Sequence, residues 1–329
     1  MLKVSQSKIK AWRKCRRSYH YAYVENLRKK KGPRPLKMGT LIHRMGELQV
    51  CGKPIQNAVD ELSVEDLNLF ETEREEYGDI IQDSLDIMTG YEEYWASNPV
   101  KPVMFRDRLA EHDMEITLTP TIRLTGKADW VVRTRNKRTW LSDRKTGKKQ
   151  LSDSQMWRNV QSTVYHRMWE ELGMKPLDGT MWDLIWSKGP SEPKINKDGS
   201  ISKAAIVTLP VVVRRFLKKH KNLDKDQVRH LLDVAVENQS RYYNRVFMPR
   251  NPEVERILLR DFITTAKEIE RGHGKRKGRN LDWHCDSCQF NNLCQARLLG
   301  LDYDFVKRTQ YAVDTETGES VGDEQEDEA

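Results

Sequence analysis

The sequence predicts a mixed α/β domain of three layers, in which a mixed central sheet is flanked by helices. Apolar residues recur at helical spacing through the first hundred residues, up to the stop signal Asn98-Pro99. Residues 103–145 then mix β-branched, aromatic and polar residues, as strands do. Helical periodicity returns after this segment. Helices, then a β meander, then helices packed on it are typical of an α/β domain.

The N-terminal part is expected to be helical. Ser7 is a suitable cap for a first helix, and apolar side chains at Ile9, Trp12, Tyr19 and Tyr23 follow it at near-helical spacing. The run of glycine and prolines at 32–35 interrupts this pattern, and a second helix is expected to start near Met38.

Three consecutive strands are expected in MFRDRLAEHDMEITL, TIRLTGKADWVVRT and TWLSDRK, the last two joined by a hairpin across Thr134–Arg138. A helix over 154–172 and a strand over 182–186 follow. The segment 188–200 is rich in Gly, Pro and Ser and predicts a loop, and further helices are expected over 223–244 and 253–271.

We expect one domain over residues 1–312. Its core spans about 100–190, and a helical region is formed by about 191–312 together with 1–100. The segment 313–329 is expected to be a disordered acidic tail, because its acids repel one another and little apolar surface offsets the ordering entropy.

The charge distribution indicates a polyanionic partner. The net charge is +8, and residues 314–329 hold eight acids and no base, so the preceding body carries about +16 by subtraction. Basic clusters along the body are what a surface that follows phosphates requires, although any one of them could simply be a solvated face. The candidate DNA-binding residues are Arg214, Arg215, Lys218, Lys219, Lys275, Arg276 and Lys277.

The N-terminus MLKVSQSKIKAW has no apolar run long enough for a signal peptide, and no segment approaches the roughly 20 apolar residues of a membrane span. We therefore expect no membrane partner and a location in the cytoplasm of a bacterium or of a phage-infected host.

Three of the five cysteines form a C-x2-C-x5-C pattern at Cys285, Cys288 and Cys294. Disulfides are rare in the cytosol, so this spacing predicts a metal or cluster site with one ligand still to be supplied. Cys15 and Cys51 are the alternatives for that ligand. Cys15 is favoured because it is placed on a basic helix, where cationic neighbours lower a thiol pKa. Four thiolates suit zinc and iron–sulfur clusters alike.

Two carboxylates and a lysine form the candidate catalytic group. Asp129 is expected on the second strand and Asp143 at the end of the third, its antiparallel partner. Residues two apart on a strand share a face, so Asp143 and Lys145 project together and Arg144 offers only its carbonyl. Such carboxylates hold Mg²⁺ or Mn²⁺ for phosphodiester hydrolysis, and the ammonium orients the nucleophile or stabilises the developing charge. Alone, the motif could also be a surface ion pair.

Other polar residues support the catalytic interpretation. Gln161 and Tyr165 lie one helical turn apart, and His43, in Gly39-Thr-Leu-Ile-His43, can bind a metal as neutral imidazole. His43 could also be a hydrogen-bonded core histidine, and Gln161 and Tyr165 could simply cap and pack their helix.

Taken in order, these motifs resemble the RecB-like branch of the PD-(D/E)xK nuclease superfamily, which includes the AddB nuclease domain, CRISPR-associated four-cysteine exonucleases and phage exonucleases. The match runs nearly end to end. Its motifs here are Ser5-Gln-Ser7 with Cys15-Arg-Arg-Ser-Tyr19, Met38-Gly-Thr-Leu-Ile-His43, Gly126-Lys-Ala-Asp129, Asp143-Arg-Lys145-Thr-Gly147-Lys148, Gln161-Ser-Thr-Val-Tyr165 and Cys285 to Cys294 with Phe290.

The resemblance implies a PD-(D/E)xK core and a divalent metal held by His43, Asp129, Asp143 and the Arg144 carbonyl. It assigns catalytic roles to the carboxylates together with Lys145, Gln161 and Tyr165. It also implies a [4Fe–4S] cluster that closes the helical region, rather than structural zinc, on Cys15, Cys285, Cys288 and Cys294.

The expected activity is that of a metal-dependent DNA exonuclease at DNA ends in recombination, repair or phage DNA metabolism. Its partner would be single-stranded or end-containing DNA, with recombination or replication proteins as further partners. A CRISPR spacer-acquisition nuclease shares every motif. The alternative outside the enzymes is a non-catalytic DNA-binding module with a structural cluster.

Overall fold

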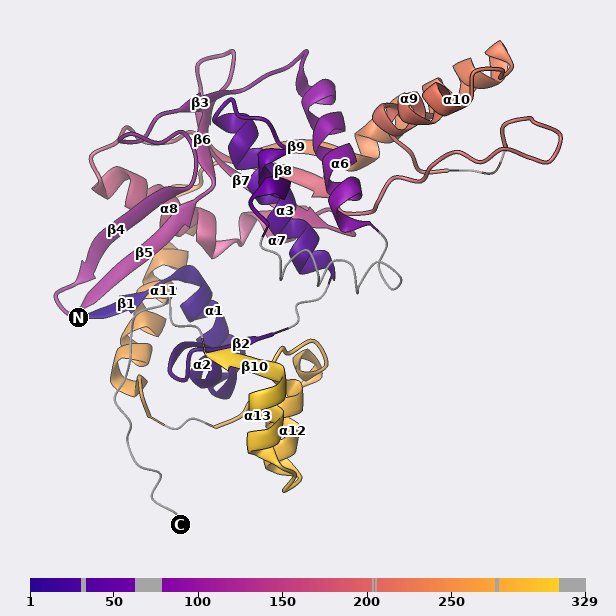
Figure 1. Ribbon diagram of the computed structural model, residues 1–329. Coiled ribbons are helices and arrows are strands. Elements are labelled where there is room, and N and C mark those ends of the chain that lie inside the picture. The colour runs from indigo at the N-terminus through magenta and orange to yellow at the C-terminus, as the bar shows by residue number, and fades with distance from the viewer. Residues whose placement is uncertain (31–33, 63–78, 203, 205, 276–277, 314–329) are drawn as a thin grey trace. The chain divides into compact units, whose positions relative to one another are not determined.

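The computed structural model describes residues 1–30, 34–62, 79–202, 204, 206–275 and 278–313 (Figure 1). The chain divides into two compact units. Unit 1 comprises Met1–Gly32, Met114–Gly126 and Pro252–Ala329, and unit 2 comprises Pro33–Asp113 and Lys127–Asn251. The predicted tail falls outside the described residues from 314 onward and stays a prediction, while Val313 is the last residue of a strand.

Unit 2 is built on a five-stranded mixed sheet. The two central strands, β7 and β8, are parallel to each other, whereas all other neighbours in the sheet are antiparallel. Strand β8 is almost entirely buried, and β7 is buried from Trp140 to Arg144, as expected for strands covered on both faces. In sheet order the strands are β3 (Lys101–Val103), β6 (Trp130–Arg133), β7 (Thr139–Gly147), β8 (Gly179–Trp186) and β9 (Tyr243–Pro249).

Helices contact both faces of this sheet. Alternate residues of β7 point to opposite faces: Lys145 contacts α8 (Val160–Glu171), whereas Arg144 and Thr146 lie against α3 (Arg34–Val50). The helices α7 (Asp153–Trp157) and α8 form the crossover that parallel strands require. The predicted mixed α/β architecture is confirmed.

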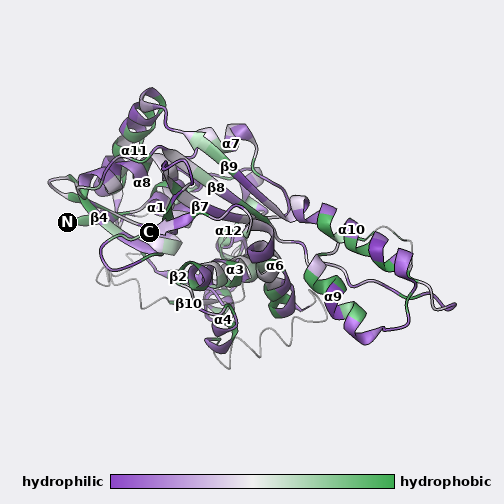
Figure 2. Ribbon diagram, turned by 90° about the horizontal axis from the view of Figure 1, so that it is seen from above, coloured by the Kyte–Doolittle hydropathy of each residue, from purple (hydrophilic) through white to green (hydrophobic). Residues whose placement is uncertain are grey.

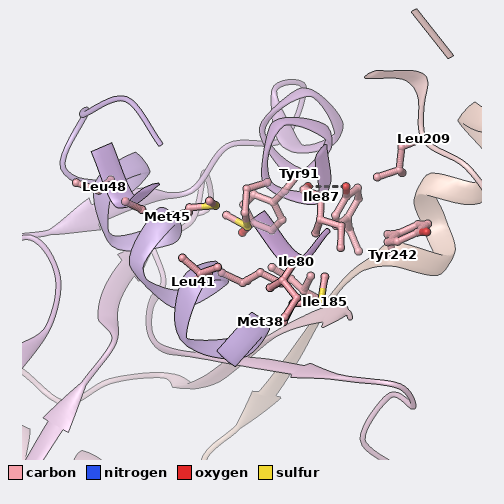
Figure 3. Close-up of a cluster of buried hydrophobic side chains, with 14 of the residues drawn as sticks. Met38, Leu41, Met45, Leu48, Ile80, Ile87, Tyr91, Ile185, Leu209 and Tyr242 are labelled. Carbon is pink, nitrogen blue, oxygen red and sulfur yellow. Dashed lines mark hydrogen bonds between the residues drawn. The ribbon is translucent and has the colours of Figure 1, made fainter. Parts of the chain in front are cut away.

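The main core of unit 2 lies between α3, α6 (Ile80–Trp95) and strand β8 (Figure 3). Met38, Met45 and Ile87 are fully buried there, and the Tyr243 hydroxyl donates to the Ile87 carbonyl at 2.7 Å. The short helix α4 (Asn57–Asp60) adds Ala58 to this core. The core therefore fixes α3, which carries His43, against the sheet.

The helices α9 (Pro210–Lys219) and α10 (Lys225–Tyr242) form a pair that projects from the rest of unit 2, as Figures 1 and 2 show. The pair has a small core of its own, which includes Val213, Phe216 and Leu231. In Figure 2 hydrophilic and hydrophobic residues alternate along both helices.

Unit 1 brings early and late segments of the chain together. Strand β10 (Tyr311–Val313) pairs antiparallel with β2 (Leu27–Lys29), and a small core beneath them includes Tyr21 and Phe290. A second, three-stranded sheet has the order β1-β5-β4. The remaining elements are β1 (Leu2–Val4), α1 (Gln6–Lys14), α2 (Arg16–Tyr23), β4 (His112–Thr119), β5 (Ile122–Ala128), α11 (Pro252–Gly272), the 3₁₀ helix Trp283–Cys285, α12 (Asn291–Leu298) and α13 (Tyr303–Gln310).

Several element predictions were wrong in detail. In the first predicted strand, residues 104–118, only the part from His112 onward is a strand, β4, whereas β3 ends at Val103, just before the predicted segment. The second breaks at Asp129 into β5 and β6, which belong to different sheets, because periodicity does not reveal a change of pairing partner. The helix over 154–172 is interrupted at 158–159, and Ser5 rather than Ser7 caps the first helix.

Within the first hundred residues, predicted as helical, the structure contains the strands β1 and β2. Cys15 is extended, with φ −161° and ψ 117°, and separates α1 from α2 instead of lying on a helix. Within the described ranges, no helix is both long and apolar enough to cross a membrane.

Candidate active site

Strand β7 carries two of the predicted catalytic residues on one face. The Lys145 Nζ atom lies 2.8 Å from Asp143 Oδ1, and the side chain of Asp143 is only 6% exposed. Arg144, between them, projects to the opposite face, where it is buried. The prediction that Asp143 and Lys145 share a face is confirmed.

Asp129 lies at the junction of β5 and β6. The antiparallel register pairs Trp130 with Ser142, so Asp129 is brought beside the Asp143–Arg144 peptide of the neighbouring strand. The backbone amide of Arg144 donates to Asp129 Oδ2 at 2.8 Å. The strand break that the sequence did not predict therefore positions the second carboxylate.

Helix α8 contributes a polar chain to the same face. Lys145 Nζ donates to Gln161 Oε1 at 3.3 Å, and Gln161 Nε2 donates to the Tyr165 hydroxyl at 3.3 Å. Asn159 caps the helix by accepting from the Gln161 amide, which fixes the first turn. The predicted pair Gln161 and Tyr165 is thus linked to the lysine, and burial raises the pKa of Tyr165 to about 12.

His43 approaches from α3. Its Nδ1 atom lies 3.8 Å from Asp129 Oδ2. Burial, and then the positive charges of Arg144 and Lys145, lower the pKa of His43 to about 4, so its imidazole is neutral at pH 7. A neutral imidazole keeps a lone pair for a metal.

The two carboxyl groups are held in a poorly solvated place. Burial raises the pKa of Asp129 and the pKa of Asp143 to about 6, although the positive charge of Lys145 acts in the opposite direction on both. Two adjacent carboxylates that are costly to ionise are typical of functional sites.

The chemistry of these side chains suits a divalent cation, because carboxylate oxygens and a neutral imidazole are common metal ligands. Asp143 Oδ2 is buried, and no group within the described residues donates a hydrogen bond to it. A buried carboxylate oxygen without a partner is costly, and a cation offsets that cost. As the side chains stand, no group of three or more His, Cys, Asp or Glu residues in the described ranges, the four cysteines of unit 1 included, is arranged to hold a metal ion.

The opposite face of β7 carries a buried ionic cluster that sequence reasoning missed. Arg144 Nε and Nη2 donate to Asp183 Oδ2 at 2.9 and 2.8 Å, and Tyr91 donates to the same oxygen at 2.8 Å. Arg245 Nη2 donates to the Tyr91 hydroxyl at 2.7 Å. An acid inside the apolar run Thr180-Met-Trp-Asp-Leu-Ile-Trp186 was the available signal, because a buried charge requires a partner.

The predicted cluster cysteines gather in unit 1. Cys15, Cys285, Cys288 and Cys294 line one cavity of about 290 Å³. Cys294 Sγ accepts from Arg279 Nε at 3.1 Å, so a cationic donor faces one of the sulfurs. Cys51 is exposed, lies in unit 2 and does not line this cavity.

Several predicted DNA-binding residues are already paired with acids. Arg214 pairs with Glu93, Lys219 with Glu192, and Arg215 forms two hydrogen bonds with Asp86, at 2.6 and 2.7 Å. Within the described part of the chain, Lys218 and Lys275 form no ion pair. Arg276 and Lys277 lie outside the described residues.

Comparison with known families decides the classification. The sequence profile of the PD-(D/E)XK nuclease superfamily matches residues 3–295. The chain belongs to this superfamily. Superfamily members are typically nucleases that hydrolyse DNA with Mg²⁺ or Mn²⁺, which agrees with the constellation on β7.

No curated protein matches the chain. A solved structure entitled "Crystal structure of SSO0001" aligns with 78% of this chain and 83% of its own, at 12% identity and a TM-score of 0.28. A similarity at this level does not show that the two proteins share a fold or a function.

Proposed function

We propose that the protein is a Mg²⁺- or Mn²⁺-dependent deoxyribonuclease of the RecB-like type that hydrolyses phosphodiester bonds at DNA ends. The observation that carries the proposal is the Asp143 Oδ2 atom beside Asp129 and Lys145, which accepts no hydrogen bond from any described residue. Buried acids with an unused oxygen and an adjacent ammonium suit cation-assisted chemistry on a phosphate better than they suit a structural ion pair.

Asp129, Asp143, the His43 imidazole and the Arg144 carbonyl would hold the cation. When bound, the cation lowers the pKa of water and neutralises charge on the phosphate. Lys145, held by Asp143 and Gln161, orients the attacking water or stabilises the developing charge. Gln161 and Tyr165 keep the ammonium in place through their hydrogen bonds.

The cysteine cavity is assigned to a [4Fe–4S] cluster. The four thiols line one cavity, and the cavity lies between segments from both ends of the chain within unit 1. Bound there, a cluster would cross-link these segments, with structural zinc as the alternative. Wild-type protein purified without oxygen should contain about four iron atoms per chain. Cys288→Ser should lose this iron, whereas Cys51→Ser should keep it. If wild type and Cys51→Ser contained zinc instead of iron, the iron assignment would be contradicted.

The nuclease proposal is tested by incubating the protein with end-labelled single- and double-stranded DNA, with and without Mg²⁺ or Mn²⁺. Wild type should shorten the DNA from its ends only when the cation is present. Asp143→Ala should lose cleavage by at least about 10³-fold and keep most DNA binding, because the basic surface is unchanged. The matched control is Asp226→Ala, because the Asp226 side chain is 88% exposed in the wild type. DNA binding without cleavage by wild type would instead identify a non-catalytic module.

A further inference from the structure

A pocket of about 360 Å³ lies in unit 2, on the face of the sheet opposite Asp143. Its wall is formed by α3, α6 and strands β3, β6, β7 and β9. Trp95, Val100, Pro102, Trp130 and Val132 make much of it apolar. A volume of this size suits one small organic ligand.

The polar end of the pocket carries excess positive charge. Arg144 and Arg245 both line it, and their side chains are only 2% and 6% exposed. Within the described ranges Asp183 is the one acid paired with them, so two buried guanidinium groups share one buried carboxylate. Glu92 also lines the pocket, but it is exposed. A ligand anion would balance the remaining positive charge.

Four residues that line the pocket have buried polar atoms with no hydrogen-bond partner in the described structure. Three are donors, and they belong to the residues that form the cationic and aromatic wall: Trp95 Nε1, Arg144 Nη1 and Arg245 Nε. The fourth is an acceptor, Gln49 Oε1. Arg245 Nε lies 3.6 Å from Asp183 Oδ1, so this ion pair accounts for it in part. Buried polar atoms in native proteins normally have partners, so the other three point to a ligand that side-chain shifts in the pocket would admit.

The pattern defines the chemistry of that ligand. Guanidinium donors recognise phosphate oxygens, apolar and aromatic walls suit a planar ring, and the glutamine acceptor suits an amino group. We propose that this pocket binds a purine deoxynucleoside monophosphate, with its phosphate toward the two arginines and its base against the apolar wall. The choice of a nucleotide rests on the proposed nuclease activity, because such an enzyme releases nucleotides.

The pocket is connected to the other face of β7 through Arg144. The same residue, Arg144, contributes its side chain to the pocket and its backbone amide to Asp129. Occupation of the pocket would therefore act on the backbone that separates Asp143 from Lys145.

Titration calorimetry of the full-length protein with dAMP tests the proposal, in EDTA so that no cation-dependent binding contributes. Wild type should bind one dAMP per chain. Deoxyadenosine and inorganic phosphate should each bind at least about tenfold more weakly, because each lacks half of the recognised groups. No binding up to about 10 mM dAMP, or phosphate binding as tightly as dAMP, would overturn the assignment.

Two variants locate the site. Val100→Trp should fill the pocket and weaken dAMP binding at least tenfold, whereas Val236→Trp, at a 58% exposed position on α10, should leave it unchanged. If circular dichroism shows that Val100→Trp is not folded, Trp95→Ala replaces it, with the same expected loss. Equal affinity in the folded variant and wild type would overturn the proposal.

Failure of this proposal is separable from failure of the nuclease assignment. A protein that cleaves DNA but does not bind dAMP in EDTA overturns only the pocket. Conversely, dAMP binding by a protein without nuclease activity overturns only the proposed function.

Discussion

The two faces of strand β7 differ in how they use charge. On one face, Asp143 and Lys145 form an ion pair in which one carboxylate oxygen has no hydrogen-bond partner in the part of the chain that the structure describes. On the other, Arg144 is bound to Asp183 by two hydrogen bonds and lies 4.6 and 4.7 Å from the ring centroids of Tyr91 and Trp130. The first arrangement suits chemistry, and the second stabilises the strand that supports it.

This contrast follows from the period of a β-strand. Because successive side chains alternate, the tripeptide Asp143-Arg144-Lys145 must serve both faces at once. Gly46 on α3 lets the helix approach, since a Cβ atom there would lie 1.7 Å from Arg144 Nη1. Asp143 and Lys145 are therefore positioned by buried contacts on the opposite face of the strand.

The largest effect on stability is expected for Arg144→Ala. Removing the guanidinium leaves Asp183 buried without its main partner, which should lower the free energy of unfolding by about 3–5 kcal/mol. Urea unfolding measures this value. Lys145→Ala, on the half-exposed face of the same strand, should cost about 1 kcal/mol or less. Equal losses in the two variants would show that the faces do not differ as described.

The carboxyl groups should make stability depend on pH. The pKa of Asp143 is raised to about 6 in the folded protein, compared with about 3.9 in an unfolded chain, so the folded state binds more protons between these values. Stability without metal should therefore fall as the pH rises from 4 to 6, by up to about 3 kcal/mol per group.

Asp143→Asn does not ionise and should show less of this loss. Without metal it should be more stable than wild type at pH 7.5 and no more stable at pH 4. Unfolding curves across this pH range provide the measurement. Parallel profiles for the two proteins would show that ionisation of Asp143 does not cause the loss of stability.

Gly46→Ala tests the approach of α3 to the arginine. The added methyl group meets Arg144 Nη1, and the overpacking should outweigh the gain in helix propensity, for a net loss of about 1–2 kcal/mol. Thermal unfolding reports the loss. The control is Gly278→Ala, where a Cβ atom would meet nothing within 4 Å. A stabilised Gly46→Ala would show that the helix does not press on the arginine.

The smallest effect is expected at the basic surface. Lys218→Ala should weaken DNA binding several-fold and reduce the salt slope by about one, because Lys218 forms no ion pair with a described residue and can contact a phosphate. Arg215→Ala should change DNA binding less, since Arg215 is bound to Asp86. Titrations across a salt series compare the two. A larger loss of affinity in Arg215→Ala would reverse this assignment.

Sequence reasoning predicted the face of β7 that carries Asp143 and Lys145 better than the face that carries Arg144. Local motifs and the two-residue period of a strand were enough to place Asp143 with Lys145, and the hairpin across Thr134–Arg138 brought Asp129 near them. The break of the chain at Asp129 was missed because it depends on which strands pair.

The partners of Arg144 could not be predicted for a related reason. Tyr91, Asp183 and Arg245 are distant in sequence and meet only through the parallel register of β7 with β8 and the packing of α6. The ion pairs of Arg214 with Glu93 and of Arg215 with Asp86, both acids on α6, were not predicted either, because they are likewise tertiary contacts.

The catalytic cation is tested most directly by a Mn²⁺ titration of the protein at pH 7.5, followed by electron paramagnetic resonance. We expect one Mn²⁺ site per chain in wild type and an affinity at least about 100-fold lower in Asp143→Asn, with the control Asp226→Ala equal to wild type. Equal Mn²⁺ affinity in Asp143→Asn and wild type would contradict the claim that this face of β7 holds the catalytic cation.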